Sequence, residues 1–144
     1  MNMNQTHIFG ESLFRLLHAY KRALRENFTV AGIELTVSHI RVLKRIASMP
    51  QCTAQAVAAG MQIDKGRIAR LMKELETEQL IEKRHHPEDS RSRQITLTHQ
   101  GRTLIERINT VEAETSEYMV AGIDKEQLMT CAHIINVMVK NLDT

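Results

Sequence analysis

The chain has 144 residues, of which 42% are hydrophobic and 25% charged, and its formal net charge is +2. This length is enough for one domain with a real core, and the composition is that of an ordinary globular protein. No apolar run approaches the roughly 20 residues that a membrane-spanning helix needs, and the first residues lack the basic and apolar regions of a signal peptide. We therefore expect a cytoplasmic protein with no membrane partner.

Basic and acidic side chains are distributed unevenly along the chain. Residues 1–51 hold seven Lys or Arg against three acidic residues, whereas residues 104–144 hold seven acidic residues against three basic ones. This asymmetry suits a protein with one side that faces a polyanion.

The two cysteines, Cys52 and Cys131, are too few for a disulfide framework, and neither belongs to a CxxC motif. We expect two reduced thiols, with Cys131 on an apolar helix face; redox sensing is the alternative. His85 and His86 lack a third ligand nearby for zinc, so no metal and no cofactor is expected.

In the first half of the chain, the spacing of apolar residues predicts four helices. The first runs through an apolar stripe from Phe9 to Phe28 and ends before Gly32. Gly60 is predicted to supply a left-handed turn between a short third helix, whose buried face includes Ala54, and the fourth. The predicted N-caps of helices two to four are Thr36, Thr53 and Asp64.

After the fourth helix the apolar period changes from helical to alternating. Residues 80–85 read as a strand, 87–92 as a turn and 94–97 as the returning strand. Thr98 is then the predicted cap of a fifth helix that reaches about Met119, with Tyr118 on its apolar stripe. Asp124 and Gln127 resemble a capping box at the start of a sixth helix. The predicted class is mainly α, with six helices and a two-stranded β-hairpin.

The third and fourth helices together predict a helix-turn-helix, whose second helix can lie in a DNA major groove. Basic residues of the fourth helix fall opposite its apolar face, where Arg can make bidentate hydrogen bonds to guanine or phosphate. A solvated basic face is the alternative for this helix taken alone. The hairpin that follows favours a winged helix, in which a loop arginine enters the minor groove.

Several short motifs occur in order and at matching spacing. They are Asp64-Lys65-Gly66 with Arg70 and Leu71, and Asp89-Ser90-Arg91 followed by Ile95, Leu97-Thr98 and Gly101. The chain thereby resembles the MarR family of bacterial transcriptional regulators over nearly its whole length. It departs from the family pattern at Arg67 and Ala69, where many members carry a small hydroxyl residue, and at Gln79, where glycine is common.

The resemblance implies a homodimer held by the N- and C-terminal helices, which we place at residues 1–35 and 100–144. Residues 36–99 form the DNA-binding lobe, a winged helix-turn-helix. Each dimer is expected to bind a pseudo-palindromic operator on double-stranded DNA, with recognition helices in major grooves and wings in flanking minor grooves. Many members repress, and many release DNA when a small aromatic compound binds between the dimer helices and the lobe.

These expectations assign roles to particular residues. The expected DNA-binding residues are Thr53, Lys65, Gly66, Arg67, Arg70, Lys73, Arg91 and Arg93, with Asp89 fixing the shape of the wing. The expected dimer interface contains Phe9, Leu13, Ile134, Ile135 and Met138, since the sixth helix is apolar on more than one stripe; a helix buried within one protomer is the alternative. Arg15, His18 and His39 are the candidate contacts for an aromatic acid, and unliganded surface groups are the alternative.

Two other classes of function compete with the DNA-binding regulator. A winged helix that binds another protein is one, because a fold does not fix a function. An enzyme is the other, but no nucleophile–base pair, paired carboxylates or phosphate-cradling loop occurs at a telling spacing, so we expect no catalytic residue. The operator, the regulated genes and the effector are not specified by the sequence.

Overall fold

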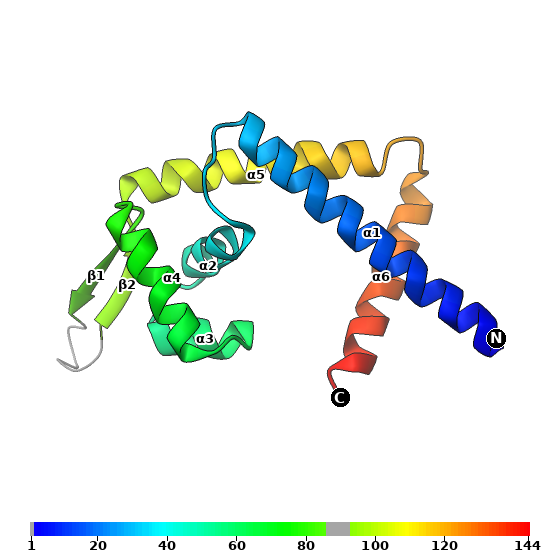
Figure 1. Cartoon of the computed structure of the whole chain (residues 1–144), viewed down its shortest axis with the longest axis horizontal. Coiled ribbons are helices and arrows are strands. Elements are labelled where there is room, and N and C mark those ends of the chain that lie inside the picture. The colour runs from blue at the N-terminus through cyan, green and yellow to red at the C-terminus, as the bar shows by residue number, and fades with distance from the viewer. Residues whose placement is uncertain (1, 86–92) are drawn as a thin grey trace.

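The computed structural model describes residues 2–85 and 93–144 (Figure 1). Its elements, in chain order, are α1 (Met3–Val30), α2 (Val37–Ser48), α3 (Ala54–Met61), α4 (Lys65–Thr77), β1 (Ile81–His85), β2 (Arg93–Leu97), α5 (His99–Met119) and α6 (Lys125–Leu142). The two strands pair antiparallel, from Ile81 opposite Leu97 to His85 opposite Arg93. The predicted mainly helical class with one hairpin is confirmed. The predicted turn, with His86, Asp89 and Arg91, lies outside the described residues.

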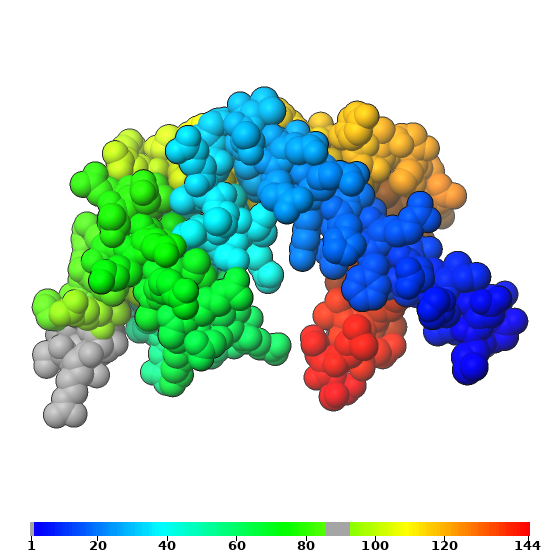
Figure 2. All heavy atoms as spheres, in the orientation of Figure 1, coloured from blue at the N-terminus to red at the C-terminus, as the bar shows by residue number. Residues whose placement is uncertain are grey.

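The elements form two regions joined by α5 (Figure 1). Helices α2, α3 and α4 gather with the hairpin at one end, and we call this part the lobe. Helix α5 runs from the hairpin across the molecule, α1 crosses it, and α6 descends from its far end. Figure 2 shows a wide hollow between the lobe and the C-terminal end of α6. The lobe therefore packs as one unit, while the start of α1 and all of α6 extend away from it.

The predicted N-cap residues are found at the starts of the helices. Hydroxyl or carboxylate oxygens accept backbone N–H bonds at Thr36, Thr53, Asp64, Thr98 and Asp124. Each bond satisfies one of the N–H groups that the first turn of a helix leaves free. The capping box predicted for α6 is not formed among the described residues, because Asp124 accepts the Glu126 N–H and Gln127 takes no part.

The predicted left-handed turn at Gly60 is wrong. Helix α3 continues to Met61, and Gln62 takes the left-handed conformation with φ of 54°. Gly60 instead leaves room for Arg45, whose Nη2 atom would lie 2.2 Å from a Cβ at position 60. Two predicted buried positions are also exposed: Ala54 in the first turn of α3, and Tyr118, since the buried stripe of α5 ends at Thr115.

The core lies mainly in the lobe. Inward-facing residues of α2 and α4 pack there with Ile81, Ile95 and the C-terminal part of α1, which contributes Leu24 and Phe28. Cys52 is fully buried in this core, and its carbonyl oxygen accepts a hydrogen bond of 2.8 Å from the Ile95 N–H. The connection between α2 and α3 is thus tied to the hairpin, which fixes the wing on the lobe.

A compact junction links α4 to the hairpin and α5. Gln79 has a φ of 61°, and the Leu80 N–H donates to Leu75 O at 3.0 Å, as in a helix end closed by a left-handed residue. Thr98 donates its hydroxyl to Gln79 O at 2.6 Å and accepts the Gly101 N–H at 3.0 Å. The glutamine that replaces the expected glycine therefore keeps the usual end geometry of α4.

Candidate nucleic-acid interface

Helix α4 separates an apolar face from a basic one. Its inner face consists of Ile68, Leu71, Met72 and Leu75, all buried in the core. Its other side carries Lys65, Gly66, Arg67, Arg70 and Lys73, all exposed. The predicted opposition of the two faces is confirmed. Burial of the inner residues fixes how the helix is rotated, so the basic side chains lie on its solvent-exposed side.

The N-terminal end of α4 is closed by its own carboxylate. Asp64 Oδ2 accepts the backbone N–H of Arg67 at 3.2 Å. A Cβ on Gly66 would come within 3.1 Å of the same oxygen, so glycine leaves this cap uncrowded. Because Asp64 supplies negative charge here, this end of the helix attracts an external anion less than an uncapped N-terminus does.

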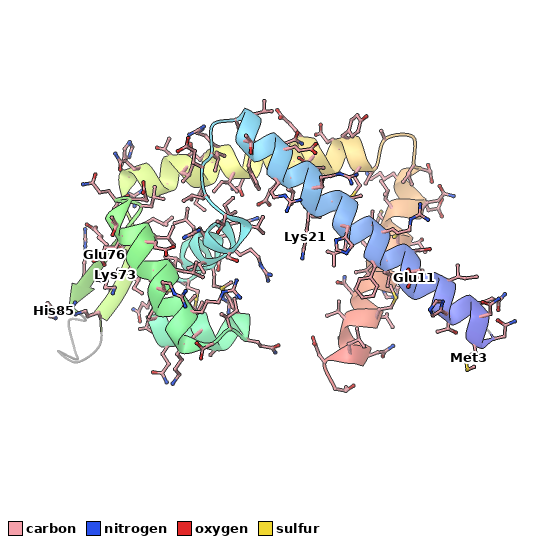
Figure 3. All side chains as sticks on the ribbon, in the orientation of Figure 1. Met3, Glu11, Lys21, Lys73, Glu76 and His85 are labelled. Carbon is pink, nitrogen blue, oxygen red and sulfur yellow. The ribbon has the colours of Figure 1, made fainter. Side chains whose placement is uncertain are left out.

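The long side chains of α4 differ in their surroundings. Arg67 donates a hydrogen bond from Nη2 to Ser38 Oγ at 3.1 Å, which links α4 to the start of α2. Among the described residues, Arg70 and Lys73 pair with no carboxylate. Figure 3 places Lys73 with Glu76 on the side of α4 next to β1, close to the wing. Arg70 and Lys73 are therefore available to an external anion.

The other expected DNA-contacting residues lie outside α4, at the start of α3 and on the hairpin. Thr53 accepts the Ala56 N–H at 3.1 Å and is half-buried, so its hydroxyl is engaged at the start of α3. Arg93 is exposed on β2, opposite His85. Arg91 and Asp89, the expected wing residues, lie outside the described residues.

All five expected interface residues line one apolar groove between α1 and α6. The groove has a volume of about 610 Å³ and also contains Leu16, Gln127, Thr130 and Cys131. Phe9, Leu13, Ile134 and Ile135 keep 41–48% of their surface exposed, and none of the 18 residues of α6 is buried. Burial of α6 within one protomer, the alternative from the sequence, is therefore wrong for the described protomer.

The three candidate ligand contacts do not converge within the protomer. Arg15 and His18 line a polar surface hollow formed by α1 alone. His39 lines a different cavity, of about 650 Å³, bounded by α2, α4, α5 and the connection between α1 and α2. There His39 contacts Glu74 of α4 through Nε2 and Thr36 through Nδ1.

The sequence analysis did not identify three carboxylates that line this cavity, Glu34, Glu74 and Glu78. It also did not identify Ser38, the partner of Arg67 at the start of α2. The available signal was a run of acidic residues at the end of α4, where a helix ordinarily favours basic ones. Among residues 2–85 and 93–144, no cluster of three His, Cys, Asp or Glu has metal-binding geometry, and no helix in this part is long and apolar enough to cross a bilayer.

Residues 35–92 match the model of the MarR family. The fold is similar to that of a MarR family protein from Bacillus stearothermophilus, with 14% identity and a TM-score of 0.86 over 100% of this chain and 99% of that one. A mutant of MarR from E. coli, complexed with operator DNA, has 16% identity and a TM-score of 0.79 over 96% of this chain and 99% of that chain.

A third similar structure is that of BpsR from Bordetella bronchiseptica. It has 20% identity and a TM-score of 0.75 over 91% of this chain and 98% of that one, and DNA binding by BpsR is regulated by 6-hydroxynicotinic acid. At these identities the likeness shows a shared fold.

Proposed function

We propose that the chain is a transcriptional regulator of the MarR family and a homodimeric repressor of a pseudo-palindromic operator. The observation that carries the proposal is the exposed basic face of α4 beside the wing. Guanidinium and ammonium groups in that position bind phosphates and guanine edges of a major groove.

We assign different roles to the cations. Arg67 and Arg70 project from the recognition helix and are the candidates for reading bases. Lys65 and Lys73 supply charge for phosphates, and Gly66 keeps the approach of the helix backbone open. Arg93 and the wing residue Arg91 contribute contacts in the flanking minor groove, with Thr53 near the backbone at the start of α3.

We propose that a second copy of the chain covers the groove between α1 and α6. An 18-residue helix with no buried residue is unusual for a folded protomer, and its apolar side chains lose contact with water when another apolar surface packs on them. Residues 1–35 and 100–144 then act as the dimerisation region, and two lobes are presented to one face of a DNA duplex.

Binding to DNA is tested by fluorescence anisotropy with the promoter of the protein's own gene and a random duplex, at several salt concentrations. We expect the promoter to bind at least about 1,000-fold more tightly than random DNA, at the lower end of the usual range for specific regulators. Equal affinities across salt would eliminate sequence-specific regulation. Arg70→Ala is expected to change the preferred operator, and Arg91→Ala to weaken all sequences.

Dimerisation is tested by light scattering coupled to size-exclusion chromatography. Leu13→Glu and Ile135→Glu each place a charge in the groove and are expected to give monomers. Asn136→Glu, on the opposite side of α6, is the matched control and is expected to stay dimeric. Dimers that persist in both groove variants, or a wild-type monomer, would refute this interface.

A further inference from the structure

The cavity beside His39 has a distinctive distribution of charge. Its apolar surface is formed by Ile33, Leu35, Leu80 and Leu104. Three carboxylates also line it: Glu34 from the connection between α1 and α2, and Glu74 and Glu78 from the end of α4. Its volume of about 650 Å³ lies within the range of small-molecule sites in proteins.

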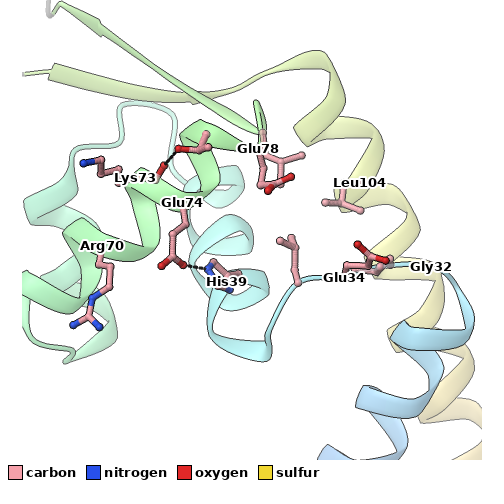
Figure 4. Close-up of a pocket in the computed structure, with 12 residues that line it drawn as sticks. Gly32, Glu34, His39, Arg70, Lys73, Glu74, Glu78 and Leu104 are labelled. Atoms are coloured by element: carbon pink, nitrogen blue, oxygen red, sulfur yellow. Dashed lines mark hydrogen bonds and ion pairs between the residues drawn. The ribbon is translucent and has the colours of Figure 1, made fainter.

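Arg70 and Lys73, which also line the cavity, form no ion pair with Glu34, Glu74 or Glu78. In Figure 4, Glu34, Glu78 and Leu104 lie together on one side of the close-up, while the charged ends of Arg70 and Lys73 on the opposite side turn away. Arg107 lies near Gly32, but its guanidinium donates to Ala31 O at the end of α1. Among the described residues, Glu34 and Glu78 form no ion pair.

The end of α4 adds a second source of negative potential. A helix carries partial negative charge at its C-terminus, and basic residues are favoured there. The last turn of α4 has no basic residue, and Glu78 is its C-cap. Acidic side chains at this position act against helix stability, and such local conflicts are characteristic of functional sites. The helix end and the carboxylates therefore both favour a cation in the cavity.

We propose that this cavity binds a small amphipathic cation, a compound with an aromatic or aliphatic body and a protonated amine or amidine. The body contacts Leu35, Leu80 and Leu104, and the cationic group lies between Glu34 and Glu78. This ligand class is opposite in charge to the aromatic acid that Arg15, His18 and His39 led us to expect. The cavity is bounded by α2, α4, α5 and the connection between α1 and α2, whereas Arg15 and His18 line a separate hollow on α1.

Ligand binding at this place acts on the recognition helix through Glu74. Glu74 contacts His39 of α2, and this contact joins the two helices near the cavity. A cation beside Glu74 competes with His39 for the same carboxylate, and a cation between Glu34 and Glu78 ties the end of α4 to the connection before α2. Both contacts change the position of α4 relative to α2, which is where Arg67 and Arg70 are held.

The test compares two probes that share a ring system and differ in charge, 2-naphthylmethylamine and 2-naphthoate. Isothermal titration calorimetry on the full chain is expected to show at least tenfold tighter binding of the amine. Glu34→Gln and Glu78→Gln, alone and together, are expected to lower amine affinity at least fivefold and to narrow the difference between the probes. Glu117→Gln, an exposed change on α5, is the control and is expected to behave as wild type.

Tighter binding of the carboxylate, or amine binding that the Glu34 and Glu78 variants leave unchanged, would overturn the proposal. A regulatory role rests on the proposed function, and we test it separately by measuring the affinity of the promoter DNA with and without saturating amine. A protein that binds the amine but no promoter would refute operator binding and leave the ligand site standing. A protein that binds the promoter but not the amine would refute the ligand site and leave operator binding standing.

Discussion

The guanidinium of Arg67 is held by the hydroxyl of Ser38, with 3.1 Å between Nη2 and Oγ. The two residues belong to different helices, α4 and α2, so the first turns of both helices are linked through one exposed side chain. Since the Arg67 backbone N–H also donates to Asp64, this residue is anchored at both ends. Arg67 is therefore presented to a ligand in a restricted geometry, which reduces the conformational entropy lost on binding.

Ser38→Ala is expected to weaken binding to the preferred operator by about fivefold, because one modest hydrogen bond is worth about 1 kcal/mol. Fluorescence anisotropy measures the effect, with Ser48→Ala at the other end of α2 as the matched control. If Ser38 acts only by positioning Arg67, the two alanine variants Ser38→Ala and Arg67→Ala are non-additive in a double-mutant cycle. Additive effects would show that the hydroxyl acts independently of Arg67.

Gln79→Gly is expected to stabilise the protein by about 1 kcal/mol, since a left-handed backbone costs residues other than glycine about that much. Gln79 has a φ of 61°, and its side chain forms no hydrogen bond with the described residues. Thermal unfolding should show a rise of about 2–4 °C in Tm. Gln100→Gly applies the same change in the first turn of α5, where the backbone is right-handed, and is not expected to raise stability. A loss of stability in Gln79→Gly would contradict the argument.

Much of the fold follows from local sequence signals. The N-caps Thr36, Thr53, Asp64 and Thr98 satisfy backbone groups next to them in sequence, so a single sequence reveals them. The turn predicted at Gly60 is wrong because the role of this glycine depends on Arg45, which is 15 residues away in sequence. The left-handed residue is instead Gln62, whose residue type disfavours that conformation.

The candidate site is only partly visible in the sequence. The basic face of α4 follows from helical periodicity, because its buried and exposed sides alternate with the turns. The partners of its side chains do not follow from periodicity. Ser38 contacts Arg67, and His39 contacts Glu74, only because α2 and α4 pack together. The cavity beside His39 likewise requires four separate segments to come together, and no local pattern specifies its charge.

Gly101→Ala is expected to destabilise the protein by about 2 kcal/mol, within the range for overpacked cores. A Cβ at this position would lie 2.1 Å from Leu80 O, a backbone atom fixed by its hydrogen bond with the Thr98 N–H. Urea unfolding measures the change. Gly60→Ala is the matched control, because there the added Cβ meets only the mobile end of Arg45 and alanine favours the helix. Equal stability of the Gly101→Ala variant and wild type would contradict this account.

The two cysteines are expected to differ in reactivity toward a thiol reagent such as DTNB. Cys131 is exposed in the protomer and lines the α1–α6 groove, whereas Cys52 is fully buried. We expect one thiol to react quickly in the monomeric Ile135→Glu variant and more slowly in the wild-type dimer. The Cys131→Ala variant should lose this fast reaction, and Cys52 should react only after denaturation. Fast reaction of Cys52 in the folded protein would contradict its burial.

Cys52 also predicts a pH dependence of stability. Burial raises the pKa of the Cys52 thiol above its ordinary value, and the positive charge of Arg45 opposes this rise. The unfolded chain therefore ionises first as the pH increases. The stability that comes from keeping the thiol neutral is complete below the unfolded pKa of about 8.5 and is lost as the pH rises toward the folded value.

Comparison of wild type with Cys52→Ala isolates this contribution from the titration of lysines and tyrosines. The difference in free energy of unfolding between the two proteins is expected to be constant from pH 6 to about pH 8 and to shrink above about pH 8.5, because only wild type carries the buried thiol. Urea unfolding at a series of pH values gives this difference directly. A difference that stays constant to pH 10 would show that Cys52 ionises equally in the folded and unfolded chains.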